Sequence, residues 1–493
     1  MKQRNLLDNL QVIQEPNSMI EVENLVIGSG PGGSITACLL AEAGKEVLLV
    51  EEGPFLLQNS CRAFSYEEIQ QKYRNGGITI AIGSPKIAYV EGCCVGGGSE
   101  INSGLYHRTP PEILKQWQEK YQIKDFSSSE LDPYFELCEN DLNVCYSPFD
   151  LPKASLKLHE GAQKLNWKSS EIPRWFRYSE SVKSDHQKGI RQSMTETFIP
   201  RFLKAKGMLL YSTRVLRLHQ QGKKWIVEAS YKKGDISRAV SIQATNIFVA
   251  AGAIHTPALL RRSGIKKNIG NQLKLHATLK IVAEFQDKVN HSHMGVPVHQ
   301  VKEFAPKYSF GCSISSPPFL SLALLEHRDQ VVTANNWQNM AIYYAMIAGG
   351  NGKVRNIPFS QDPLVRYSLS LNDLQNLSDA IRDICRLLLS AGAKNIFPQI
   401  QGNPIIKNLN DLIHIRSPIS RKNSNLMTIH LMGSCPMGEN ESLCAVDSFG
   451  KLHGIKGLYI ADASLLGGAP GVNPQGTIMA LVRRNVVSFL NKD

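Results

Sequence analysis

The chain has 493 residues, more than the ~100–200 of one ordinary domain, and this length predicts two or three domains. Apolar residues make up 42% and charged residues 20%, a composition that excludes a disordered chain. The 55 Lys and Arg outnumber the 43 Asp and Glu, which gives a net charge of +12. Such an excess raises nucleic acid, an anionic membrane and an acidic substrate as partners.

The N-terminal residues and the cysteines indicate the compartment. Residues 1–18 begin with basic side chains but contain no apolar core of the length that a secretory signal needs. No stretch approaches the ~20 apolar residues that span a bilayer. The ten cysteines are scattered, without CxxC pairs or histidine spacing suited to zinc. We therefore expect a cytoplasmic protein with free thiols and no metal site.

A strand, a glycine turn, a helix and a second strand are predicted over residues 24–50. Gly28, Gly30 and Gly33 form G-x-G-x-x-G directly after the first apolar run, and Glu51 follows the second run, 23 residues after Gly28. Glycines there allow a pyrophosphate to approach the helix N-terminus, and the carboxylate accepts hydrogen bonds from ribose hydroxyls. The pattern predicts a site for FAD or NAD, since an acid at Glu51 disfavours a 2′-phosphate.

The rest of the chain continues with mixed elements. Residues 92–105 are too rich in glycine for a regular element and predict a tight loop. Strands are predicted between residues 206 and 270, and alternating strands with one amphipathic helix, 372–391, between 280 and 420. Residues 457–493 contain an apolar strand at 457–461, a turn-rich stretch and an amphipathic helix.

Several motifs occur in the order typical of one flavoprotein family. They read GSGPGGSITACLLAEAGKEVLLVEEG, GCCVGGGSEIN, AGAIHTPALLRRSGI, HLMGSCPMG and LYIADASLLGGAPGVNPQGTIMAL. With them the chain resembles the glucose–methanol–choline (GMC) oxidoreductases over nearly its whole length. Within that family the motifs look most like those of the long-chain alcohol oxidases, with the cholesterol oxidases next.

The resemblance implies an α/β fold, α+β overall. We expect a Rossmann-like FAD-binding domain with an inserted substrate domain, built on a mainly antiparallel sheet with helices. The expected FAD-binding segments are 20–150, 201–280 and 426–493, the last with the catalytic pair. The expected substrate-domain segments are 151–200, a cap segment, and 281–425.

Two residues are identified as the catalytic pair through the resemblance. His430 stands where the family places the base that takes the hydroxyl proton, and Asn473 where it places the hydrogen-bonding partner. A histidine suits this work because its unperturbed pKa is ~6.5. Outside these motifs His430 would be interpreted as a structural or solvated histidine, and Asn473 as a turn residue before Pro474.

The resemblance also assigns residues to the cofactor. Asp462 ends a predicted strand, where open α/β sheets present ligand-binding groups. Some family members attach FAD covalently to a histidine in the second motif, and Ile101 occupies that position here, so we expect non-covalent FAD. The cofactor-binding residues are expected to be Gly28, Gly30, Gly33, Glu51, Gly97, Gly98, Ser99, Asn102, Ala251, Asp462 and Pro474.

The implied function is FAD-dependent oxidation of the CH–OH group of a hydrophobic alcohol, long-chain or sterol-like, as an oxidase or a dehydrogenase. The proton would leave to a base and the hydride to the flavin. The alternative is a non-oxidative flavoprotein of the same fold, a lyase or a fatty-acid photodecarboxylase. Oxygen, a quinone or another carrier would take the electrons.

The net charge is local in the sequence. Residues 153–238 hold 19 Lys and Arg against 7 Asp and Glu, which equals the whole excess. Nucleic acid is disfavoured because no base-reading motif accompanies the charge. A solvated basic face is one interpretation. The other is peripheral contact with an anionic membrane, with Trp167, Trp175 and Phe176 as interfacial anchors.

Overall fold

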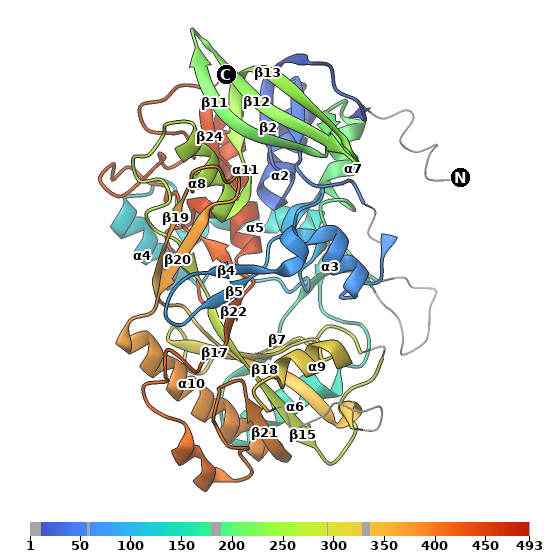
Figure 1. Cartoon of the computed structure of the whole chain (residues 1–493), viewed down its shortest axis with the longest axis vertical. Coiled ribbons are helices and arrows are strands. Elements are labelled where there is room, and N and C mark those ends of the chain that lie inside the picture. The colour runs from blue at the N-terminus through green and yellow to red at the C-terminus, as the bar shows by residue number, and fades with distance from the viewer. Residues whose placement is uncertain (1–10, 57–59, 179–188, 293, 328–335, 493) are drawn as a thin grey trace.

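Two sheets organise the chain, one in each half of the molecule (Figure 1). The computed structural model describes residues 11–56, 60–178, 189–292, 294–327 and 336–492. The mixed α/β architecture with a Rossmann-like unit confirms the predicted fold class.

The first sheet is mostly parallel and carries the predicted glycine turn. Six of its strands run parallel, and β12 and β11 add an antiparallel edge. Apolar runs without alternation suit a sheet covered on both faces. In order its strands are β1 (Val12–Ile13), β10 (Met208–Leu210), β3 (Val47–Val50), β2 (Met19–Ile27), β13 (Ile236–Val249), β12 (Lys224–Lys233) and β11 (Thr213–Gln221), with β24 (Leu458–Ile460) also paired to β13.

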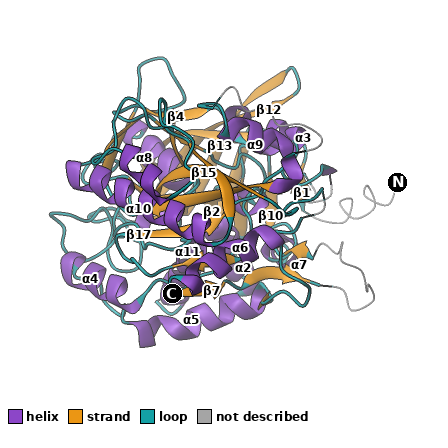
Figure 2. Ribbon diagram, turned by 90° about the horizontal axis from the view of Figure 1, so that it is seen from below, coloured by secondary structure: helices purple, strands orange, loops and turns teal. Residues whose placement is uncertain are grey.

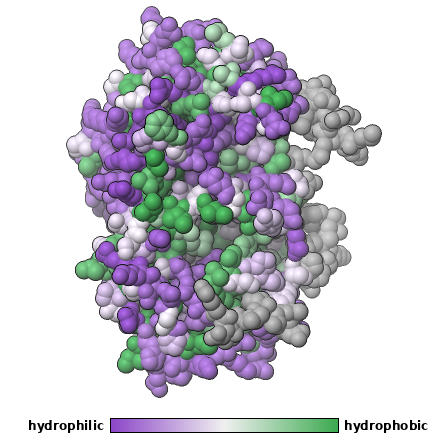
Figure 3. All heavy atoms as spheres, viewed as in Figure 1, coloured by the Kyte–Doolittle hydropathy of each residue, from purple (hydrophilic) through white to green (hydrophobic). Residues whose placement is uncertain are grey.

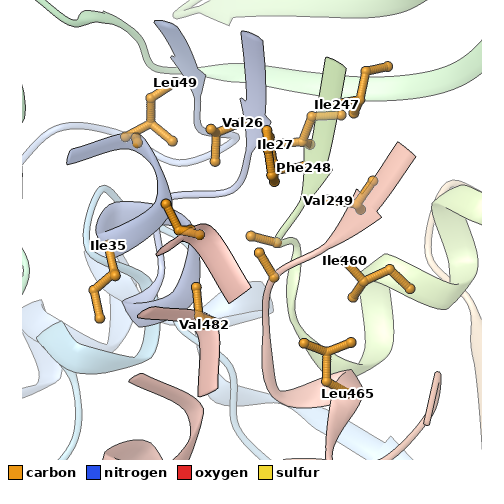
Figure 4. Close-up of a cluster of buried hydrophobic side chains, with 14 of the residues drawn as sticks. Val26, Ile27, Ile35, Leu49, Ile247, Phe248, Val249, Ile460, Leu465 and Val482 are labelled. Atoms are coloured by element: carbon orange, nitrogen blue, oxygen red, sulfur yellow. The ribbon is translucent and has the colours of Figure 1, made fainter. Parts of the chain in front are cut away.

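Helices bury the apolar side chains of this sheet. Helix α2 (Pro31–Glu42) packs against α11 (Gln475–Leu490) and α7 (Phe198–Lys204), and α11 packs against α5 (Ser128–Asp141). Figure 4 shows side chains from β2, β3, β13, β24, α2 and α11 meeting in one cluster. Each fully buried Val, Leu or Ile there contributes roughly 1.5–3 kcal/mol. This core fixes the end of β2, where the glycine turn begins.

The second sheet is mainly antiparallel, with one parallel pair between β22 and β5. Its strands in order are β4 (Thr79–Ala81), β5 (Ile87–Tyr89), β22 (Leu426–Thr428), β15 (Ala277–Phe285), β18 (Met340–Ile347), β17 (Tyr308–Cys312), β16 (His299–Val301) and β7 (Ser169–Glu171), with β21 (Ala393–Pro398) paired to β15.

Helices α10 (Leu371–Ser390) and α6 (Lys153–Lys164) pack on one face of this sheet. The capping box of Ser370 and Asp373 starts α10, and its apolar stripe faces the strands. The predicted helix at 372–391 is confirmed within one residue at each end. Figure 2 shows the helices around the strands in a second view.

Smaller elements complete the fold. The two-stranded pairs are β14 (Lys274–Leu275) with β23 (Leu431–Met432) and β19 (Asn351–Arg355) with β20 (Leu364–Ser368), and a small sheet joins β6 (Val144–Cys145), β8 (Arg174–Arg177) and β9 (Ile190–Arg191). Among the described residues, the remaining α-helices are α3 (Tyr66–Lys72), α4 (Pro111–Tyr121), α8 (Gly252–Arg262) and α9 (Pro317–Ala323).

Segments distant in the sequence share the second sheet. Strands β4 and β5 lie within 20–150, the stretch expected to belong to the FAD-binding domain, yet they pair into the sheet expected for the substrate domain. Their central residues are exposed and their outer residues buried, the alternation of a half-covered strand. Strand β22 pairs beside them from more than 330 residues later.

Of the three predicted interfacial anchors, one is buried and two, Trp167 and Phe176, are partly buried. Trp175 is 1% exposed, so its assignment as an anchor is wrong. Its indole packs under the 92–105 loop, where a Cβ on Gly104 would lie 2.9 Å from the indole nitrogen. Trp167 packs edge-on against Phe304, and Phe176 stacks on Tyr178. These three side chains give no support to membrane contact.

The basic segment is also divided between the two halves of the molecule. Helix α6 lies on the second sheet, whereas β11 and β12 form the edge of the first (Figure 1). Arg201 and Arg214 form ion pairs with carboxylates. Among the described residues, no helix is both long enough and apolar enough to span a bilayer.

Candidate active site

A large cavity opens beside the carboxyl ends of the parallel strands. It encloses about 1520 Å³ of atom-free space, its open mouth included. Figure 3 shows apolar side chains gathered across the middle of one face of the molecule. Of the predicted site residues, those lining the cavity are Gly28, Gly30, Glu51, Gly97, Gly98, Asn102, Ala251, His430, Asp462, Asn473 and Pro474.

The first glycine turn places a helix N-terminus against the cavity. Gly28 has φ of +100°, and a Cβ on Gly33 would lie 1.8 Å from the Gly28 carbonyl oxygen, so both positions require glycine. At Gly30 a Cβ would meet nothing within 4 Å, because this residue borders the open cavity. Gly33 therefore supports the turn from behind, and the first N–H groups of α2 are left for an anionic group.

Glu51 is held in place by the protein. It is 7% exposed. One carboxylate oxygen accepts from the Ser29 amide at 3.0 Å and the Ser29 hydroxyl at 2.7 Å, and the other accepts from the Gly53 amide at 2.9 Å. Burial raises the pKa of this carboxyl, and the three hydrogen bonds oppose that shift. The acid at the end of β3 is thus oriented by three donors.

The second glycine loop closes over the first. Gly97 has φ of +54°, and a Cβ there would lie 2.8 Å from the Gly30 Cα, whereas a Cβ on Gly98 would meet nothing within 4 Å. Ser99 is fully buried beneath the loop and accepts from the Met194 amide at 3.0 Å. The structure thus places Ser99 behind the loop, while Gly98 borders the cavity.

Asn102 also lies on this loop. Its Nδ2 donates to Gln475 Oε1 at 2.7 Å, and its Oδ1 accepts from the Gly104 amide at 3.0 Å. The amide thereby ties the loop to the start of α11, close to Pro474. Ile101 is 9% exposed and does not border the cavity.

Asp462 binds three segments together at the end of β24. Oδ2 accepts from the Gly252 amide at 2.9 Å and the Thr256 hydroxyl at 2.5 Å, and Oδ1 accepts from the Ser464 amide at 2.8 Å and hydroxyl at 2.5 Å. Burial raises the pKa of this carboxyl, against these hydrogen bonds. The carboxylate fixes the N-terminus of α8, which follows Ala251.

His430 and Asn473 both border the cavity, on loops from different parts of the fold. The half-buried His430 follows β22, and its Nδ1 lies 2.9 Å from Nδ1 of His276. Burial lowers the pKa of His430 to about 4, so the imidazole is neutral at pH 7. Asn473 precedes α11, and its Oδ1 accepts from Nε2 of Gln300 at 3.4 Å.

Four residues of this region were missed by sequence reasoning. His276 is fully buried, and its Nε2 accepts from the Gly471 amide at 3.0 Å. Gln300 also donates to the Tyr344 hydroxyl at 3.3 Å. His107 is 7% exposed, with no hydrogen bond of good geometry to a described residue. Gln300 and Tyr344 lie in strands, whereas His276 and His107 lie outside them. Single buried polar residues resemble core residues, and no spacing links these four in the sequence.

The cavity fits an adenine dinucleotide. Two helices, α2 and α8, begin at its wall, and helix N-termini favour phosphate. Glu51 stands 23 residues after the first glycine, as ribose recognition requires. Gly30 and Gly98 leave open space where a bound group needs close approach to backbone. The donors, the acid and the open glycines therefore suit FAD.

Comparisons with known proteins identify the family. The chain matches the family models described as GMC oxidoreductase over residues 69–278 and 359–481, and the NAD(P)-binding Rossmann-like domain over 26–84. It is 38% identical to an uncharacterized GMC-type oxidoreductase of Sinorhizobium fredii, across 94% of both chains.

More distant relatives are named by their activity. A long-chain-alcohol oxidase of Arabidopsis thaliana is 26% identical, over 97% of this chain and 70% of that protein. The crystal structure of pyridoxine 4-oxidase from Mesorbium loti has the same fold, with a TM-score of 0.72 and 17% identity over 95% of this chain and 99% of the other. The two GMC family models and the Sinorhizobium relative are decisive: this chain belongs to the GMC oxidoreductases and is an FAD-dependent oxidoreductase.

Proposed function

We propose that this protein oxidises the CH–OH group of a hydrophobic alcohol, long-chain or sterol-like. The observation that carries the proposal is that His430 and Asn473 border the same cavity as the glycine loops that suit FAD. Apolar Leu105, Ile429 and Leu431 line the wall near the pair. Relatives named long-chain-alcohol oxidase, at 23–26% identity, support this substrate class.

The chemistry divides between the cofactor and the chain. FAD, when bound, supplies the acceptor for the hydride that leaves the alcohol carbon. Gln300 engages the amide oxygen of Asn473, so the Nδ2 hydrogens are the ones left to hold the alcohol oxygen. His430 is the proposed acceptor of the hydroxyl proton. That role needs a lone pair on the ring nitrogen that faces the alcohol.

We further propose that FAD is held without a covalent bond. Ile101 occupies the position from which some relatives attach the flavin through a histidine, and an aliphatic side chain cannot form that bond. The cofactor would be retained by the α2 and α8 N-termini, Glu51 and the glycine loops.

Anaerobic flavin reduction tests the reaction. The purified holoenzyme is mixed with primary alcohols of increasing chain length, secondary alcohols and sterols, and the loss of the yellow flavin absorbance is followed. We expect long-chain or sterol alcohols to bleach the flavin. A flavin that stays oxidised with every alcohol in the panel contradicts the proposal.

Variants test the role proposed for His430. His430→Gln should retain FAD and lose ~10²-fold or more of the reduction rate, the range of general acid–base effects. His453→Gln is the matched control, since His453 lies 3.0 Å from the Gly438 carbonyl and outside the cavity. Equal rates in wild type and His430→Gln would remove His430 from the reaction.

The same preparation identifies the electron acceptor and checks the alternative function. Reoxidation is compared with oxygen, a quinone and an artificial acceptor. Release of CO₂ from a fatty acid under blue light, with no bleaching by any alcohol, would replace the oxidation by photodecarboxylation.

A further inference from the structure

Two histidines share one hydrogen at the catalytic end of the cavity. His276 Nδ1 and His430 Nδ1 are 2.9 Å apart, with ring planes at 83°. At this distance one nitrogen donates and the other accepts. Neutral imidazole carries a single N–H, so the position of this hydrogen determines the tautomer of both rings.

The Gly471 amide decides which nitrogen is the donor. It lies 3.0 Å from Nε2 of His276, and a backbone N–H can only donate, so that nitrogen must accept. His276 is fully buried, and burial holds its pKa well below 6.5, with His430 adding to the shift. A neutral His276 whose Nε2 accepts has its hydrogen on Nδ1, and Nδ1–H therefore donates to His430.

The tautomer of His430 follows from this arrangement. Because its Nδ1 accepts, a neutral His430 carries its hydrogen on Nε2. We propose that His276, oriented by the Gly471 amide, is a positioning residue that holds His430 in the Nε2–H tautomer. The tautomer itself does not depend on which reaction the protein catalyses, whereas its consequence for an alcohol rests on the proposed function.

In this arrangement His430 offers a donor to the alcohol oxygen. With the Nδ2 hydrogens of Asn473, it forms a pair of N–H groups that can hold a hydroxyl or an alkoxide oxygen. Accepting the hydroxyl proton on Nε2 first requires the opposite tautomer, in which His430 Nδ1–H donates to His276 Nδ1 and His276 carries its hydrogen on Nε2. To reach it, the His276 Nδ1 proton passes to His430 Nδ1, the His430 Nε2 proton leaves to solvent, and a proton from solvent reaches His276 Nε2, so the pair keeps two protons in total.

That second arrangement sets two hydrogens against each other at Gly471. The amide hydrogen and His276 Nε2–H would both point into the 3.0 Å gap. Gly471 must therefore move away before His430 can act as a base, and it lies two residues before Asn473. When the hydroxyl proton then transfers to His430 Nε2, the histidine pair holds one additional proton. The loop that carries Asn473 thus controls whether His430 donates or accepts.

The pH dependence involves few neighbours. Among the described residues, the titratable groups that interact with His430 are His276 and His107, and Lys302 acts on His107. Burial is the first cause of the lowered pKa of all three histidines. A hydrogen bond from His276 to the neutral form of His430 disfavours its protonation further.

The experiment measures the tautomer directly. The FAD-loaded enzyme is labelled with ¹⁵N-histidine, and long-range ¹H–¹⁵N correlations distinguish Nε2–H from Nδ1–H rings, with His430 assigned by its absence in His430→Gln. We expect His430 as Nε2–H at pH 7. An Nδ1–H signal for His430 overturns the proposal, whether or not any alcohol reduces the flavin.

Variants separate positioning from structure. His276→Asn keeps a donor toward His430 and should keep its Nε2–H signal, whereas His276→Phe removes the donor. In His276→Phe we expect both tautomers, and an acid limb of the flavin-reduction profile raised by up to about one pH unit, because one hydrogen bond of ~0.5–1.5 kcal/mol is lost while the burial of His430 remains. His299→Phe, another buried histidine of the second sheet with a pKa of about 4, is the control that should shift neither. An unchanged tautomer and pH profile in His276→Phe overturn the proposal.

Discussion

Replacing Asp462 by Asn removes one carboxylate oxygen from a buried junction. That oxygen becomes an NH₂ group, which cannot accept, and two of the four donors lose their partner. The hydroxyl of Thr256 or Ser464 can rotate and accept from the new group, but the backbone amide on the same side cannot. In the variant, a buried backbone N–H therefore points at an N–H of the new amide group, with no acceptor between them.

The magnitude follows from the hydrogen bonds. Bonds to a charged acceptor contribute roughly 1.5–3 kcal/mol each, so losing both would cost ~3–6 kcal/mol, and the bond that the rotated hydroxyl re-forms reduces this loss. Removing a buried charge whose pKa is raised by burial offsets part of this loss. We expect the free energy of unfolding to fall by about 3 kcal/mol, a large share of the ~5–15 kcal/mol of a typical protein.

Urea unfolding in saturating FAD, followed by tryptophan fluorescence, measures the change. Asp132→Asn is the control, since Asp132 pairs with Arg108 in a partly exposed contact and should cost less than ~1 kcal/mol. If Asp462→Asn unfolds within 1 kcal/mol of wild type and keeps its FAD, the role assigned to this junction is wrong.

Further outcomes concern the cofactor site and acid stability. Gly30→Ala should fold but bind FAD at least ~10-fold more weakly, because its Cβ enters open cavity space. Gly33→Ala should fail to fold, since its Cβ would lie 1.8 Å from the Gly28 carbonyl oxygen. Flavin titration measures the first effect and circular dichroism the second. Because Ile101 stands where some relatives have the histidine that attaches the flavin, acid precipitation should release all the flavin into the supernatant. Flavin that stays with the pellet would contradict non-covalent binding. The pKa of His430 is about 4 in the folded chain and ~6.5 in the unfolded chain, so the unfolded state binds the proton first as pH falls. The free energy of unfolding should therefore fall between pH 6.5 and 4, by up to ~1.4 kcal/mol per pH unit. Urea unfolding at pH 7 and 5 should show a larger loss for wild type than for His430→Gln.

The glycine turn could be predicted from sequence because local rules determine it. The order of strand, glycines, helix and acid fixes the relative positions of Gly28 and Glu51 within one βαβ unit. The family motifs added His430 and Asn473. The structure brings both of these to one cavity wall, although more than 40 residues separate them.

The neighbours of the pair could not be predicted in this way. His276 meets His430 only because β14 pairs with β23, and Gln300 reaches Asn473 from β16, on the far side of the second sheet. Such contacts depend on nonlocal strand pairing. Trp175 was misinterpreted for a related reason, since the loop that covers it lies 70 residues earlier in the chain.

The interleaving of the two sheets has a consequence for how the chain folds during synthesis. Strand β24 pairs with β13 at residues 458–460, and β22 joins β5 to β15 at 426–428. Neither sheet can be completed until the ribosome has made almost the entire chain, and pairings so distant slow folding. The early strands therefore keep unpaired edges until then, and a chain that ends before residue 458 lacks Asp462, Asn473 and Pro474, which line the cavity.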